Sequence, residues 1–143
     1  MPGASAAGSA MCGVCALHAR EGGPPLIAWT DGMWLVRHHA HPAPLAGWFL
    51  LDSLRCVRNA ADFSDAEAAA FGAVLRRVTH AVREACGVPR TYTIMFGEGA
   101  PHLHAHIIPR DPAEPASCAW AVPPTLICWH SFSVPFNAVS AAI

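Results

Sequence analysis

The chain has 143 residues, the size of one domain, and 53% of them are apolar, which is enough to build a core. Its net charge is −1 with histidine neutral, so composition gives no reason to expect a nucleic-acid or membrane-surface partner. All of its basic residues other than histidine are arginines, which excludes a lysine nucleophile or Schiff base, and no stretch reaches the roughly 18 apolar residues of a membrane span.

Residues 1–11 are mostly Ala, Gly and Ser and predict a flexible N-terminus without a signal peptide. We therefore expect a cytoplasmic protein whose six cysteines are reduced. The first two form the pattern Cys12-Gly13-Val14-Cys15. This pattern by itself fits half of a zinc site, a redox pair, or two small buried residues, since a tetrahedral site needs two further ligands.

Three segments in the first half of the chain predict strands: 26–30, 33–38 and 47–52. Asp31-Gly32 between the first two indicates a hairpin with a type I′ turn. The segment from His38 to Pro44 contains His38, His39, His41 and two prolines, so we predict a loop. Its histidines are predicted to lie near a site or in solvent, and the alternative is that they are ligands.

A long amphipathic helix is predicted to begin after Ser64, which with Glu67 forms a capping box, and to end at Gly87. Its apolar side chains recur at helical spacing. A fourth strand, 91–96, follows it and leads through Gly97-Glu98-Gly99 into the segment 101–110.

The segment Pro101-His-Leu-His-Ala-His-Ile-Ile-Pro-Arg110 alternates three histidines with apolar residues. Side chains of a strand point alternately to its two faces, so His102, His104 and His106 are predicted to share one face. The apolar residues between them are predicted to pack on a core. Residues 115–143 differ from the rest because they contain no Asp, Glu or Arg and many bulky apolar side chains. We expect this tail, whose role the sequence leaves open, to be dispensable for chemistry.

A row of imidazoles supports two kinds of chemistry. A neutral imidazole is a nucleophile toward phosphorus, a second histidine can hold it in the right tautomer, and a third can protonate the leaving group or bind phosphate oxygens. The row can instead bind a metal ion, although neighbouring histidines on one strand are far apart for a single ion.

The sequence from His102 to Arg110 resembles the signature of the histidine triad superfamily, and the order of elements over roughly residues 12–110 is also similar. The resemblance implies an α+β fold with an antiparallel sheet of about five strands and one long helix, often in homodimers. It also implies hydrolysis or transfer of nucleotidyl groups at an α-phosphate. His104 would be the nucleophile, His106 would assist at the phosphate and leaving group, and His102 would support the site or bind zinc.

Zinc-containing members of that superfamily use the Cys-x-x-Cys pair, the first triad histidine and a histidine after the third strand. Cys56 stands in the place of that last histidine, and cysteine is an equally good zinc ligand. The resemblance therefore implies a structural zinc bound by Cys12, Cys15, Cys56 and His102.

The chain departs from the superfamily pattern around the predicted substrate. Val36-Arg37-His38 stands where many members carry an acidic residue for the ribose hydroxyls, and Glu98 cannot donate hydrogen bonds when ionised. Phosphate binding is thus assigned to the amides of Gly97 and Gly99 and to Arg110. The leading hypothesis is a nucleotide phosphohydrolase or phosphoramidase. The alternatives are a nucleotidyltransferase, a low-turnover nucleotide-binding protein and a protein that only binds metal.

Overall fold

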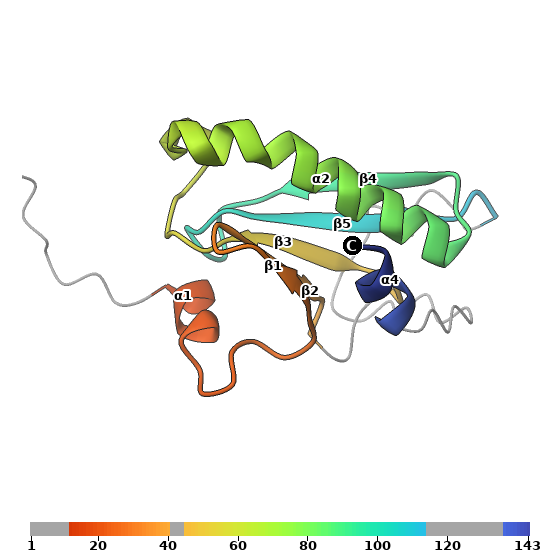
Figure 1. The fold of residues 1–143 in the computed structure, drawn as a ribbon, viewed down its shortest axis with the longest axis horizontal. Coiled ribbons are helices and arrows are strands. Elements are labelled where there is room, and N and C mark those ends of the chain that lie inside the picture. Colours follow the sequence, from red (N-terminus) through yellow and green to blue (C-terminus); the bar gives the residue numbers. More distant parts are fainter. Residues whose placement is uncertain (1–11, 41–44, 114–135) are drawn as a thin grey trace, which may run out of the picture.

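The computed structural model describes residues 12–40, 45–113 and 136–143, which form a five-stranded antiparallel sheet with helices around it (Figure 1). The strands follow the order β1-β2-β3-β5-β4 across the sheet. In chain order the elements are α1 (Gly13–His18), β1 (Ile27–Thr30), β2 (Trp34–His38), β3 (Phe49–Ser53), η1 (Ala60–Asp62), α2 (Asp65–Cys86), β4 (Arg90–Met95), β5 (His104–Arg110) and α4 (Phe136–Ala142). The predicted α+β fold is confirmed.

The sheet has an apolar face and a polar face. Helix α2 packs on the apolar face, where Phe49 and Leu51 of β3 and Ala105 and Ile107 of β5 join its Val78 in one core. Because side chains alternate along a strand, the residues between them point the other way. The polar face therefore carries Leu50 and Asp52 of β3 opposite His106 and His104 of β5.

Helix α2 begins and ends as the sequence predicts. The Ser64 hydroxyl accepts a hydrogen bond from the Glu67 amide, and the Glu67 carboxylate accepts one from the Ser64 amide at 2.7 Å, so both halves of the capping box are present. Gly87 ends the helix in the left-handed conformation, with φ of 63°, which glycine adopts without steric cost.

The hairpin between β1 and β2 is present, but its predicted turn type is wrong. A type I′ turn needs positive φ at both central residues, whereas here only Gly32 has it. The Asp31 carboxylate instead accepts hydrogen bonds from the amides of Met33 and Trp34, at 2.9 and 2.8 Å. The connection between β1 and β2 is therefore longer than two residues, and hydrogen bonds to the Asp31 carboxylate stabilise it.

The histidine segment is only partly a strand. β5 begins at His104, so His104 and His106 share a face of the sheet as predicted, whereas His102 lies in the preceding turn. The His102 amide donates to the Ala100 carbonyl at 2.8 Å, and the Leu103 amide donates to Val57 at 2.7 Å. These bonds turn the chain just before β5 and direct His102 away from the other two histidines.

Two helices lie outside the elements that the sequence predicts. α1 begins within the Cys-x-x-Cys pattern and lies across the sheet from α2, and α4 lies near the end of α2 (Figure 1). α4 and the residue after it place Val139 and Ile143 in the same core as α2. The other bulky apolar residues of the tail, from Trp120 to Phe132, lie outside the described residues, as does the flexible segment predicted for residues 1–11.

Helix α2 and the start of β3 approach each other closely at Gly47. This glycine has φ of 80°, and a Cβ atom there would lie 2.4 Å from the sulfur of Cys86 at the end of α2. Only glycine fits this contact, and Trp48 follows it directly.

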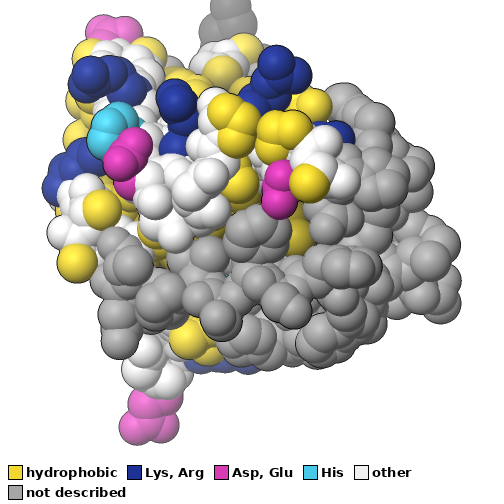
Figure 2. Space-filling view, turned by 90° about the vertical axis from the view of Figure 1, so that its right-hand side faces the viewer, with side chains coloured by type: hydrophobic (Ala, Val, Ile, Leu, Met, Phe, Trp, Pro, Cys, Tyr) yellow, Lys and Arg dark blue, Asp and Glu magenta, His cyan; other side chains and the backbone are white. Residues whose placement is uncertain are grey.

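One end of the molecule carries side chains of both charges. Figure 2 shows the end of the molecule that lies on the right in Figure 1, where basic and acidic side chains alternate with apolar ones. Within the described ranges, no helix is long and apolar enough to cross a membrane.

Candidate functional site

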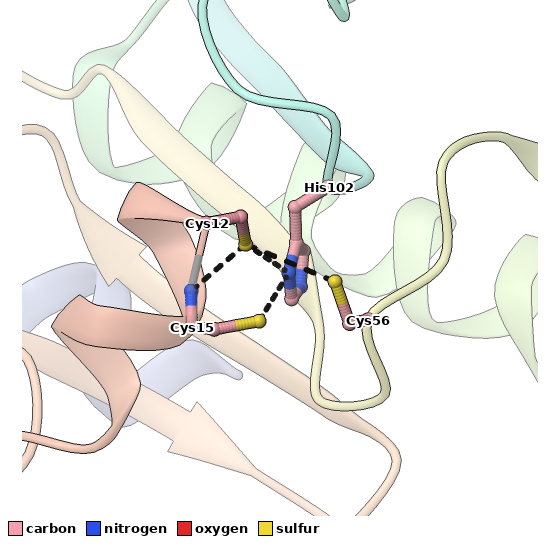
Figure 3. A group of neighbouring side chains, drawn as sticks. All are labelled: Cys12, Cys15, Cys56 and His102. Atoms are coloured by element: carbon pink, nitrogen blue, oxygen red, sulfur yellow. Dashed lines mark hydrogen bonds between the residues drawn. The ribbon is translucent and has the colours of Figure 1, made fainter. Parts of the chain in front are cut away.

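Four predicted metal ligands converge from three distant parts of the chain (Figure 3). Cys12 and Cys15 lie at the start of α1, Cys56 lies in the loop after β3, and His102 lies just before β5. Their ligand atoms all lie within 4.8 Å of one another. The chain thus brings together the set Cys12, Cys15, Cys56 and His102.

Three distances within this cluster are close to those of tetrahedral zinc. Bonds of about 2.3 Å to sulfur and about 2.0 Å to nitrogen at tetrahedral angles place two sulfurs about 3.8 Å apart, and a sulfur and a nitrogen about 3.5 Å apart. The sulfurs of Cys12 and Cys56 are 3.8 Å apart. His102 Nδ1 lies 3.4 Å from the sulfur of Cys12 and 3.3 Å from that of Cys15. The cluster therefore fits a structural zinc ion with three sulfur ligands and one nitrogen.

Contacts with the backbone and with a neighbouring ring fix the tautomer and orientation of His102. Its Nε2–H donates to the Ser53 carbonyl at 2.6 Å, so Nδ1 carries the lone pair that faces the thiols. His102 is fully buried, and the ring of His18 packs edge-on against it at 5.4 Å between centroids. The ligand nitrogen is thus aimed at the cluster by groups that are not ligands themselves.

One thiol of the cluster favours its anionic form. Burial raises the pKa of Cys12, but the hydrogen bonds from the side chain and the amide of Cys15 lower it overall to about 6. The Cys15 amide contributes one of these bonds, at 3.2 Å, because Cys12 is the N-cap residue of α1. The thiolate is the form that binds metal, so the start of α1 favours metal binding.

His104 and His106 lie side by side on the polar face, with ring centroids 5.1 Å apart and planes at 70°. The Nδ1–H of His104 donates to the His102 carbonyl at 2.7 Å, which leaves Nε2 with a free lone pair. In His106 the unprotonated nitrogen is Nδ1 instead, because it accepts a hydrogen bond from the indole N–H of Trp48 at 3.0 Å. Burial, followed by the charges of His104 and other neighbours, lowers the pKa of His106 to about 4.

A buried charged group lies between this pair and the metal cluster. Asp52, the register partner of His104, is fully buried and accepts from Arg37 Nε at 2.6 Å and from His18 Nε2 at 3.0 Å. Burial raises the pKa of Asp52, but the bonds from His18 and Arg37 lower it overall. Since Asp52 has no exposed surface, this carboxylate does not offer a contact for ribose hydroxyls.

Two further rings lie near His106. The centroid of the His39 ring lies 6.5 Å from that of His106 and 5.0 Å from that of Trp48, to which it is tilted by 52°. The largely exposed Phe96 lies 6.4 Å from His106. Of the other histidines predicted to lie in this loop, His38 is the buried last residue of β2 and packs on Phe49, and His41 lies outside the described residues.

Of the three predicted phosphate-binding residues, Arg110 lies apart from the two glycines. Gly97 and Gly99 are exposed in the turn between β4 and β5, and the Gly97 amide donates to the Glu98 carboxylate at 3.3 Å. Arg110 ends β5, four residues or about 13 Å beyond His106, and donates to the carbonyl of Asp111. Phosphate contacts from these residues remain a prediction.

Sequence reasoning missed the residues that hold the site together: Trp48, Asp52 and His18. The only local signal is the charge of Asp52 at the end of an apolar run, because a charge in a buried strand needs a partner. The partners themselves depend on strand register and on the unpredicted α1, so neighbouring residues do not indicate them.

Comparison with solved structures gives matches of one fold. The chain matches a zinc-bound histidine triad family protein from Mycobacterium smegmatis with a TM-score of 0.62 and 17% identity, over 90% of this chain and 89% of that one. It matches a hypothetical histidine triad nucleotide-binding protein from Sulfolobus tokodaii with a TM-score of 0.57 and 16% identity, over 81% and 78%.

The C. elegans NitFhit protein matches with a TM-score of 0.56 and 25% identity over 61% of this chain, which spans only 22% of NitFhit. No family model and no curated protein matches the sequence. The strand order, the long helix, the position of the histidine pair and these structural matches together lead to one conclusion: the chain has the fold of the histidine triad proteins.

Proposed function

We propose that the protein is a zinc-containing member of the histidine triad superfamily that cleaves nucleotides at the α-phosphate through a nucleotidyl-histidine intermediate. The observation that carries this proposal is the tautomer of His104. Its Nδ1–H is bound to a backbone carbonyl at 2.7 Å, so the unprotonated Nε2 is available to attack phosphorus.

The reaction has two balanced steps. The Nε2 lone pair of His104 forms a bond to the α-phosphorus while the bond to the leaving group breaks, and its electron pair departs with that group. A nitrogen leaving group also takes up a proton from solvent, whereas a phosphate leaving group needs none. Water then attacks phosphorus, the N–P bond returns its pair to Nε2, and the proton of the water goes to solvent. Throughout, Nδ1–H stays bonded to the His102 carbonyl, which stabilises the positive charge on the modified ring.

The remaining groups have supporting roles in this proposal. His106 contacts the phosphate and leaving group, and Gly97, Gly99 and Arg110 bind phosphate. When bound, zinc holds α1 and the loop of Cys56 against the start of β5 and takes no part in the reaction. Phe96, which is exposed beside His106, offers an aromatic face on which a base can stack.

The proposed substrates are dinucleoside polyphosphates and nucleoside phosphoramidates. The alternative is transfer of the nucleotidyl group to a phosphate acceptor, which differs only in whether water or a second substrate reaches the intermediate. A low-turnover nucleotide-binding protein is a further alternative, favoured by the name of the Sulfolobus neighbour. We further propose a cytoplasmic homodimer.

A His104→Ala variant tests the proposal. The full chain and the variant are incubated with diadenosine polyphosphates and with adenosine phosphoramidate, without added divalent metal. Loss of the nucleophile is expected to lower kcat by at least about 10³-fold. His80→Ala, which removes an exposed histidine from α2, is the control and keeps full activity. Equal turnover in the parent and His104→Ala would refute the nucleophile, and radiolabelled nucleotide trapped on His104 separates catalysis from binding.

A further inference from the structure

We propose that Trp48 holds His106 as a neutral imidazole with its proton on Nε2, and that this makes the site selective for phosphoanhydride substrates over phosphoramidates. The selectivity part rests on the proposed function, whereas the state of His106 is independent of it.

The geometry fixes which nitrogen carries the proton. An indole N–H only donates, so the group 3.0 Å from Trp48 Nε1 must accept, and that group is His106 Nδ1. The ring proton of the neutral imidazole is then on Nε2. Trp48 is only 8% exposed, and its ring meets that of His106 edge-on, with centroids 5.6 Å apart and planes at 72°. The indole is therefore held in place by packing as well as by the hydrogen bond.

Protonation of Nδ1 would turn this bond into a clash between two N–H donors. The buried indole would lose its acceptor, and an unsatisfied buried donor is unfavourable. The surrounding charges act in the same direction. Burial opposes a positive charge on His106 most strongly, and His104, His39 and Arg37 add to its effect. Asp52 opposes them but is already paired with Arg37 and His18, and the β4 residue opposite His106 is the uncharged Ile94.

A neutral His106 limits which leaving groups can depart. In a phosphoanhydride, the bond from the α-phosphorus to the bridging oxygen breaks, and the electron pair stays on a phosphate oxygen that needs no proton. In a phosphoramidate, the P–N bond breaks and the pair goes to nitrogen, which must receive a proton. His106 cannot supply it, because loss of the Nε2 proton would leave an imidazolate. Its Nε2–H instead donates a hydrogen bond to a phosphate oxygen.

The first test reads the state of His106 without substrate. In the full chain labelled with ¹⁵N-histidine, the nitrogen shifts of His106 are followed between about pH 5 and pH 8. We expect an unprotonated Nδ1 and a protonated Nε2 throughout. In Trp48→Phe, which keeps an aromatic ring and removes the N–H, the titration midpoint of His106 is expected to rise by about one pH unit or more.

Trp29→Phe is the matched control, because it makes the same chemical change on β1 and leaves the His106 shifts unchanged. A parent His106 that carries its proton on Nδ1, or that becomes imidazolium between about pH 6 and pH 7, would overturn the assignment. This readout on the parent decides the point even if Trp48→Phe does not fold.

The second test compares kcat/KM for diadenosine tetraphosphate and adenosine phosphoramidate. The parent is expected to prefer the anhydride by about 10²-fold, the lower end of what a general acid contributes, and Trp48→Phe is expected to narrow this preference by about tenfold near pH 6. Equal rates for the two substrates in the parent, or the same preference in both proteins, would contradict the selectivity. If neither substrate turns over, the proposed function fails, and the nitrogen shifts still decide the state of His106.

Discussion

The metal cluster and the histidine pair both include histidines of the segment before and within β5. The two regions differ in which nitrogen of the imidazole ring carries the proton. In His102 the Nε2–H donates to a backbone carbonyl, so Nδ1 carries the lone pair that faces the thiols. In His104, two residues later, the Nδ1–H donates to a backbone carbonyl, so the lone pair of Nε2 is available on the polar face. Motif and residue type are the same at both positions. The partner of one nitrogen decides what the other nitrogen can do.

Removal of a metal ligand is expected to have the largest effect and to act on the metal cluster alone. Cys56→Ala is expected to lose the stoichiometric zinc and at least about 4 kcal/mol of the free energy of unfolding, because structural metal is part of the fold. Metal analysis and chemical denaturation measure both quantities. Cys86→Ala, a buried cysteine outside the cluster, keeps its zinc. If the parent holds no stoichiometric zinc and Cys56→Ala is as stable as the parent, the metal site is refuted.

The next largest effect is expected at Asp52, which lies between the two regions. Asp52→Asn leaves the buried Arg37 without its counter-charge and is expected to lower the free energy of unfolding at neutral pH by about 3 kcal/mol.

The pH dependence of this effect has a definite sign. The pKa of Asp52 in the folded chain lies below its ordinary value of 3.8, so its contribution is complete above that value and is lost as the pH falls through the folded pKa. The stabilities of the parent and Asp52→Asn therefore converge in acid. Denaturation curves at a series of pH values test this, and a constant difference down to about pH 2 would contradict it.

The smallest effect is expected at His18, the only described side chain of α1 that bonds to Asp52. His18→Ala removes one hydrogen bond to a buried carboxylate and is expected to cost about 2 kcal/mol while zinc content stays unchanged. Arg20→Ala, an exposed change just after α1, is the control. Loss of zinc in His18→Ala would show that the metal cluster depends on His18, through its contact with His102 or through its bond to Asp52, so the two regions would no longer count as separate.

What could be predicted from the sequence is what depends on neighbouring residues. The ends of α2 follow from Ser64, Glu67 and Gly87, all within one turn of where the helix begins or ends. The placement of His104 and His106 on one face follows from the period of a strand. α1 was missed because it has only six residues and its N-cap is a cysteine, which is not among the usual capping residues.

The parts that could not be predicted depend on contacts across the sheet. Trp48 and His106 are 58 residues apart, and His18 and Asp52 are 34 residues apart. Their pairing needs the strand register and the position of α1, and neither has a local signal. The zinc ligands were an exception, since the resemblance supplied the set that the Cys-x-x-Cys pattern alone left open.

The close contact at Gly47 has a consequence for how the chain tolerates variation. Gly47 carries no functional group, yet a side chain there would meet the sulfur of Cys86 and would have to adopt a left-handed backbone. The next residue is Trp48, which contacts His106. A saturation mutagenesis screen should therefore find Gly47 as intolerant as a catalytic residue. Larger residues at Cys86, on the far side of the sheet, should reduce activity because they displace the backbone that positions the indole.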